Sequence, residues 1–121
     1  MLPSLDNKRG IAFVTSVDQL RDLIKFMSTA EISIRFALIF GGNDTTKFAE
    51  ELQNGPANVS SATELVKLRS MKGLVALSSQ LGCRHLVIGC PHATLSQLII
   101  RLFRWSQLVL LDDGIVTYRL R

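Results

Sequence analysis

The sequence has no apolar run near the ~20 residues that a membrane-spanning helix requires. Its beginning, Met1 to Arg9, reaches charged residues after too short an apolar stretch for a signal peptide. We therefore expect a cytoplasmic protein. The 121 residues, 47% of them apolar, suit one domain over 1–121 with a single core.

Cysteine is scarce, with only Cys83 and Cys90 in the chain. The six residues between them match neither a Cys-x-x-Cys redox pair nor a four-ligand zinc set, so we expect free thiols and no metal site. Phosphate-binding motifs are also missing. Gly41-Gly42-Asn43-Asp44 lacks the Gly-x-Gly-x-x-Gly spacing of dinucleotide sites and the Lys-Ser/Thr of a P-loop. The sequence thus predicts no nicotinamide or ATP cofactor.

Aromatic residues make up only 7% of the chain and do not alternate with basic residues, which argues against a nucleic-acid partner. The net charge of +4 comes from lysines and arginines spread along the chain. Loose groupings occur at Lys67, Arg69 and Lys72, and at Arg101, Arg104, Arg119 and Arg121. Spread charge favours an anionic partner weakly, and a membrane surface or a sugar nucleotide fits it equally well.

Apolar runs alternate with segments of helical periodicity along the chain. Strands are predicted at 11–15, 32–40, 85–89 and 108–111, and helices at 18–30, 45–52, 61–81 and 94–102. The helix over 61–81 is predicted to begin at the capping box Ser61-Ala62-Thr63-Glu64. Residues 115–120 form either a last short strand or a frayed tail. This alternation predicts a Rossmann-like three-layer α/β/α fold with a small, mostly parallel sheet of four to five strands.

Polar loops follow each predicted strand, at the sheet edge where ligands bind in such folds. They supply the candidate ligand-binding residues Ser16, Gln19, Gly42, Asn43, Gly89 and His92. His92 serves either a phosphate or proton transfer, or is a simple capping residue. The helical stripe of Leu95, Leu98, Ile99 and Leu102 either packs on the sheet or, with its basic flank, lies on a membrane.

The most informative pattern is Val109-Leu110-Leu111, a buried strand that stops at Asp112-Asp113-Gly114. One interpretation makes a carboxylate the general base, because a partly buried acid beside another acid has a raised pKa. The other makes Asp-Asp-Gly an ordinary turn. Both remain open on these residues alone.

The stretch from Leu111 to Tyr118 resembles the Asp/Glu-Asp-Gly motif of bacterial sialyltransferases and polysialyltransferases, the GT-B enzymes of capsule and lipooligosaccharide synthesis. The turn Thr15 to Leu20 and the unit His85-Leu86-Val87-Ile88-Gly89 are similar to that family too. The resemblance implies an acceptor-side N-terminal domain. Asp112 would be the base that deprotonates the acceptor sugar hydroxyl, and Asp113 and Gly114 would shape its turn and contact the ligand.

In that family a His-Pro motif in a second domain holds the CMP-sugar donor. This chain has Pro91-His92 instead and ends seven residues after Gly114, so the resemblance implies half of an enzyme that is inactive by itself. It also allows a location at the periphery of the inner membrane. The alternative is a non-catalytic, flavodoxin-like module that binds a small anion or a protein partner. A further alternative is a self-associating domain that forms homo-oligomers, if the apolar helix stripes exceed what one small sheet can cover.

Overall fold

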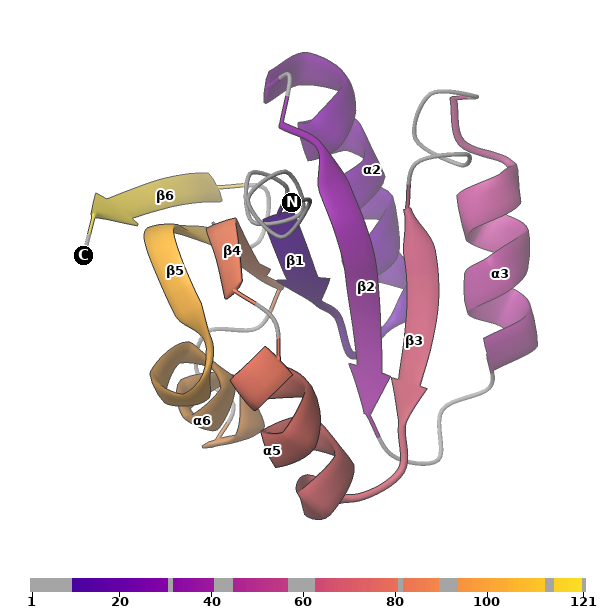
Figure 1. The fold of residues 1–121 in the computed structure, drawn as a ribbon. Helices are drawn as coiled ribbons and strands as arrows, with labels where there is room; N and C mark the ends of the chain where they lie inside the picture. The colour runs from indigo at the N-terminus through magenta and orange to yellow at the C-terminus, as the bar shows by residue number, and fades with distance from the viewer. Residues whose placement is uncertain are drawn as a thin grey trace, which may run out of the picture.

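The computed structural model describes residues 10–30, 32–40, 45–56, 63–80, 82–89, 94–112 and 115–120. Within these ranges, ten elements follow one another (Figure 1). They are β1 (Gly10–Phe13), α2 (Val17–Ala30), β2 (Ile34–Phe40), α3 (Thr45–Gln53), β3 (Glu64–Leu68), α5 (Met71–Gln80), β4 (Gly82–Ile88), α6 (Thr94–Leu102), β5 (Arg104–Asp112) and β6 (Ile115–Leu120).

The strands form one sheet in the order β3-β2-β1-β4-β5-β6. Strands β1 to β5 are parallel, and β6 is antiparallel to β5. The predicted Rossmann-like α/β fold is confirmed, and the strand order is that of dinucleotide-binding sheets rather than the 2-1-3-4-5 order of flavodoxin. The sheet has six strands instead of four to five, because residues 64–68 and 115–120 both join it.

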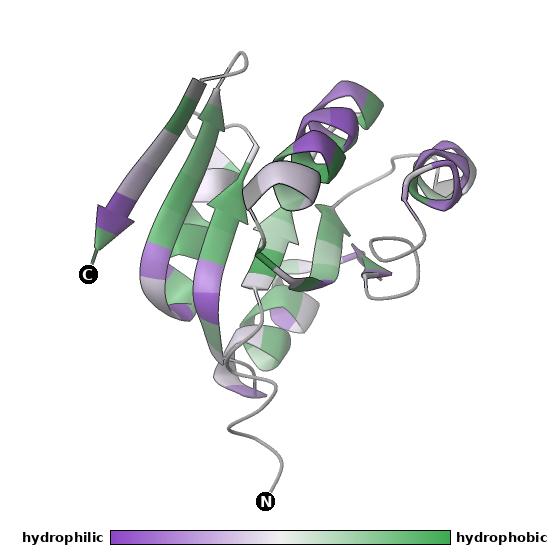
Figure 2. Cartoon of the chain, turned by 90° about the horizontal axis from the view of Figure 1, so that it is seen from above, coloured by the Kyte–Doolittle hydropathy of each residue, from purple (hydrophilic) through white to green (hydrophobic). Residues whose placement is uncertain are grey.

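Helices cover both faces of the sheet, α2 and α3 on one side and α5 and α6 on the other (Figure 2). On the first side Leu20, Leu23 and Phe48 pack against strand residues such as Val87 and Val109. On the second side, Leu74 and Ile99 pack against Phe13, Leu38 and Ile88. Burying such side chains contributes about 1.5–3 kcal/mol each, which explains why the central strands are almost entirely apolar.

The predicted helix over 61–81 is wrong in its first half. Glu64–Leu68 is strand β3, paired in parallel with β2, and helix α5 begins only at Met71. The hydroxyl of Thr63 donates a hydrogen bond of 2.7 Å to the carbonyl oxygen of Ile34, which ties the start of β3 to β2. Pairing with β2 outweighs local helix propensity here. Ser61 and Ala62 lie outside the described residues.

The true N-cap of α5 is Ser70, whose Oγ accepts a hydrogen bond of 3.1 Å from the backbone N–H of Gly73. Outside the backbone of its own helix, a Cβ added at Gly73 would have only this Oγ within 4 Å, at 3.5 Å, so an added methyl group fits without a clash. We predict that Gly73→Ala raises the free energy of unfolding by about 0.5–1 kcal/mol, since alanine restricts the unfolded chain and favours the helix. Urea titration measures the gain, and an unchanged or lowered midpoint would contradict it.

The remaining elements agree with the sequence analysis within a few residues. Helices α2, α3 and α6 begin and end close to the predicted limits, and β4 and β5 start earlier than expected. Residues 115–120 are a strand rather than a frayed tail. Ile99 is fully buried, so the stripe of α6 packs on the sheet. Arg104 and Trp105 belong to β5, and the indole N–H of Trp105 donates to the carbonyl of Ile100 at 2.9 Å.

Candidate functional site

The carboxyl ends of β1 and β4 lie side by side at the centre of the sheet. The backbone N–H of Gly89 donates to the carbonyl oxygen of Phe13 at 3.0 Å, and that of Val14 donates to Leu38 at 3.1 Å. From β1 the chain continues through α2 to β2 on one side, whereas β4 leads through α6 to β5 on the other. Ligands of doubly wound sheets bind at such a reversal of strand order.

Ser16 and Gln19 close the turn between β1 and α2. Ser16 Oγ accepts a hydrogen bond of 3.2 Å from the backbone N–H of Gln19, so Ser16 is the N-cap. Gln19 Oε1 accepts from the backbone N–H and the hydroxyl of Thr15, at 2.8 and 3.0 Å. This Ser-x-x-Gln arrangement is close to a capping box. Asp18 lies in the first turn of α2.

Gly89 is in contact range of the same side chain. A Cβ built at Gly89 would come within 2.8 Å of Gln19 Oε1 and 3.2 Å of Gln19 Cβ. The residue after β4 must therefore be small for Gln19 to reach Thr15. Three predicted site residues, Ser16, Gln19 and Gly89, thus meet at one place, where hydrogen bonds hold the turn after β1 in a fixed shape.

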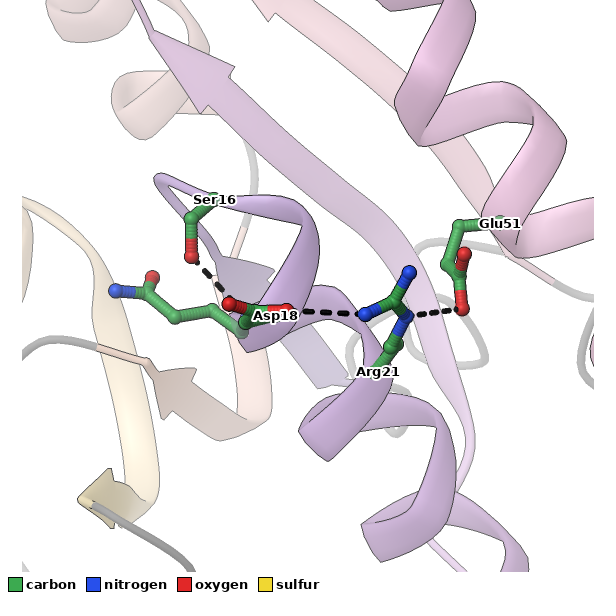
Figure 3. A network of polar contacts seen from close by, with 5 residues as sticks. Ser16, Asp18, Arg21 and Glu51 are labelled. Atoms are coloured by element: carbon green, nitrogen blue, oxygen red, sulfur yellow. Dashed lines mark hydrogen bonds and ion pairs between the residues drawn. The ribbon is translucent and has the colours of Figure 1, made fainter.

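Arg21 links this turn to α3 (Figure 3). Its Nε donates to Glu51 at 2.8 Å and its Nη1 to Asp18 at 3.1 Å. The hydrogen bond to Glu51, together with the charge of that carboxylate, raises the pKa of Arg21 above its usual value. The side chain is largely exposed, so this bridge orients α2 against α3 more than it stabilises the fold.

Asp112 is the last residue of β5, at the carboxyl edge of the parallel strands. Phe13 of β1, Ile88 of β4 and Leu110 of β5 share one level of the sheet. Two residues beyond this level in sequence come Thr15, in the turn after β1, and Asp112, the last residue of β5. Because β4 lies between β1 and β5 and neighbouring strands are about 4.8 Å apart, the ends of these two strands are roughly 10 Å apart.

Asp112 also pairs with Ile115, the first residue of β6. Only Asp113 and Gly114 separate the paired positions, and Asp-Gly is a favoured sequence for two-residue hairpin turns. The turn interpretation and the strand-end position are therefore compatible. Asp113 and Gly114 lie outside the described residues, as do three other predicted site residues, Gly42, Asn43 and His92.

A cavity of about 230 Å³ lies between α2 and the β5–β6 pair. It is mostly apolar, and it is lined by Asp22, Lys25, Phe26, Thr29, Leu111 and Val116. Beside it, the rings of Phe26 and Tyr118 are 6.3 Å apart, within the range of aromatic packing. Nothing in the sequence predicted this cavity. The helical spacing places residues 22, 25, 26 and 29 on one face of α2. The other wall of the cavity comes from the β5–β6 hairpin, and its position against α2 depends on tertiary packing that the local sequence does not record.

His85 and Cys83 lie on β4 away from this edge. Cys83 is a buried free thiol, as expected, and burial raises its pKa to about 12. Cys90 lies outside the described residues. Burial also lowers the pKa of His85, and the charge of Arg84 lowers it further, while a hydrogen bond with Gln107 acts in the opposite direction.

The lowered pKa of His85 predicts a pH-dependent stability. An unfolded chain holds this proton more tightly, with a pKa near 6.5, so protonation favours unfolding. Stability should be full above about pH 7 and should fall as the pH drops through 6.5 toward the folded pKa. His85→Gln should flatten this loss in urea midpoints between about pH 5 and 7.5, whereas His92→Gln should retain it. An equal slope in wild type and His85→Gln would contradict the assignment.

Within the described ranges, no cluster of three His, Cys, Asp or Glu side chains forms a metal-binding set. No helix among the described residues is long and apolar enough to cross a lipid bilayer. Comparison with known proteins finds no matching family model and no matching curated sequence.

Proposed function

We propose that this chain is the acceptor-side domain of a sialyltransferase-like glycosyltransferase, with Asp112 as the general base. The observation that carries the proposal is the position of Asp112. It ends β5 at the carboxyl edge of a doubly wound sheet, level with the turn after β1. The resemblance of Leu111 to Tyr118 to the family's acidic motif supplies the chemistry.

Transfer of sialic acid from a CMP donor requires the acceptor hydroxyl to lose a proton as its oxygen attacks the anomeric carbon. A carboxylate within hydrogen-bond reach of that hydroxyl accepts the proton. The turn after β1 lies roughly 10 Å from the end of β5 along the same sheet edge. The hydrogen bonds of Ser16 and Gln19 fix its shape, so it offers a surface that can orient an acceptor. By the same resemblance, the donor and its leaving phosphate belong to a separate domain.

Saccharide binding to the isolated chain tests this proposal. We expect capsule- and lipooligosaccharide-derived oligosaccharides to shift the backbone amide NMR signals of Gln19, Gly89 and Asp112, and CMP to leave them unchanged. Shifts confined to the cavity residues Phe26 and Val116 would contradict a site at the strand ends. Shifts by CMP or inorganic phosphate alone would favour the alternative, a non-catalytic module for small anions at the β1–β4 reversal.

A further inference from the structure

The acidic residues of this chain are absent from a long continuous segment. Between Leu65 and Leu111 there is no Asp or Glu, whereas this stretch contains Lys67, Arg69, Lys72, Arg84, Arg101 and Arg104. All six basic side chains are exposed. This segment contains α5 and α6, the helices on one face of the sheet. The uneven distribution of acids along the sequence therefore becomes an uneven distribution of charge between the two faces.

The opposite face is different in charge. Helices α2 and α3 carry Asp18, Asp22, Glu50 and Glu51 as well as three basic residues, Arg21, Lys25 and Lys47. Neither α5 nor α6 contains an acid. Figure 2 shows the same contrast in hydropathy, since α2 and α3 carry more hydrophilic colour than the two helices across the sheet. Among the described helices, those on the α5 and α6 side carry the excess positive charge, which would attract a negatively charged surface.

Apolar side chains are exposed on this basic side. Leu74 and Ser78 are the buried residues of α5, and Met71 and Val75 remain 43% and 48% exposed one turn apart. Lys72 lies between them in sequence, Arg69 lies just before the helix, and Arg101 is exposed on the adjacent α6. We call Arg69, Met71, Lys72, Val75 and Arg101 the α5–α6 face.

We propose that the α5–α6 face binds the surface of an anionic phospholipid bilayer. Its three cations complement lipid phosphates, and Met71 and Val75 can enter the interfacial layer beside them. Apolar side chains next to cations, with no aromatic residue among the five that define this face, fit a lipid surface better than a nucleic acid. Binding is weak and reversible, and it holds the sheet with α2 and α3 turned away from the membrane. This inference does not depend on the proposed transferase activity.

Sedimentation of the full chain with lipid vesicles tests the proposal. We expect binding to vesicles containing phosphatidylglycerol, none to pure phosphatidylcholine, and weaker binding in high salt. The triple variant Arg69→Gln, Lys72→Gln, Arg101→Gln should bind about a hundredfold less, at about fivefold per cation. The control Arg21→Gln, Lys25→Gln, Lys47→Gln removes the same charge from α2 and α3, across the sheet from this face, and should bind within about fivefold of wild type.

A second variant tests the apolar part. Met71→Ser with Val75→Ser should lower vesicle binding about tenfold, with an unchanged circular dichroism spectrum because both side chains are half exposed. Equal losses in the two triple variants, or no binding to anionic vesicles, would overturn the proposal. Tight binding of a single-stranded oligonucleotide that survives Met71→Ser and Val75→Ser, without vesicle binding, would assign the face to nucleic acid instead.

Discussion

Under the proposed function, replacing Asp112 with alanine should reduce sialyl transfer by about 10²- to 10⁴-fold when the chain is combined with a donor-binding domain. That range is what a positioned general base contributes. The loss should appear mainly in kcat, because deprotonation of the acceptor hydroxyl belongs to the transition state rather than to acceptor binding. Transfer of radiolabelled sialic acid from the CMP donor to an oligosaccharide measures it.

Two matched variants make this result specific. Asp113→Asn removes the neighbouring charge but keeps a polar side chain for ligand contact and a sequence that hairpin turns favour, so we expect a much smaller loss of transfer than in Asp112→Ala. Glu64→Ala removes an exposed carboxylate at the start of β3, the opposite end of the parallel strands, and should leave transfer unchanged. Wild-type rates in Asp112→Ala, or a large loss in Asp113→Asn alone, would refute Asp112 as the base.

Replacing Gly10 with alanine should cause the largest loss of stability among the substitutions considered, about 1–3 kcal/mol. A Cβ at this position would lie 2.6 Å from Cδ1 of Ile34 and 2.9 Å from the backbone oxygen of His85. The side chain of Ile34 is fully buried, so it can move away only by displacing its packed neighbours. The His85 oxygen is part of the backbone of the adjacent strand β4 and cannot move independently of that strand. β1 would have to separate from one of its two neighbours.

Urea unfolding followed by circular dichroism measures this effect, and the midpoint should fall by about 1 M for a typical slope in a small domain. Gly73→Ala is the matched control, because the same added methyl meets only the Ser70 hydroxyl. The two variants should therefore move the midpoint in opposite directions. A midpoint unchanged in Gly10→Ala would mean that β1 does not begin between β2 and β4 as described.

The same capping pattern occurs at residues 16–19 and 61–64, but only the first of these begins a helix. Ser16 and Gln19 cap the N-terminus of α2. This cap was not predicted from the sequence, although the Ser-x-x-Gln spacing is typical of one. Ser61 and Glu64 show the same spacing and predicted a helix, but Glu64 begins a strand. The difference is not local. Residues 64–68 hydrogen-bond to the outer edge of β2, and this long-range pairing makes them a strand instead of a helix.

The sequence by itself determined the alternation of strands and helices, because apolar runs and helical stripes record which side chains must be buried. It also determined that Asp112 ends a buried strand. Only the tertiary structure decided which strands are neighbours, and therefore that Ser16, Gln19 and Gly89 meet beside the level of Asp112. It likewise placed the two helices of the acid-free segment, α5 and α6, on the same face of the sheet. Strand order and helix side depend on long-range pairing, which local patterns do not record.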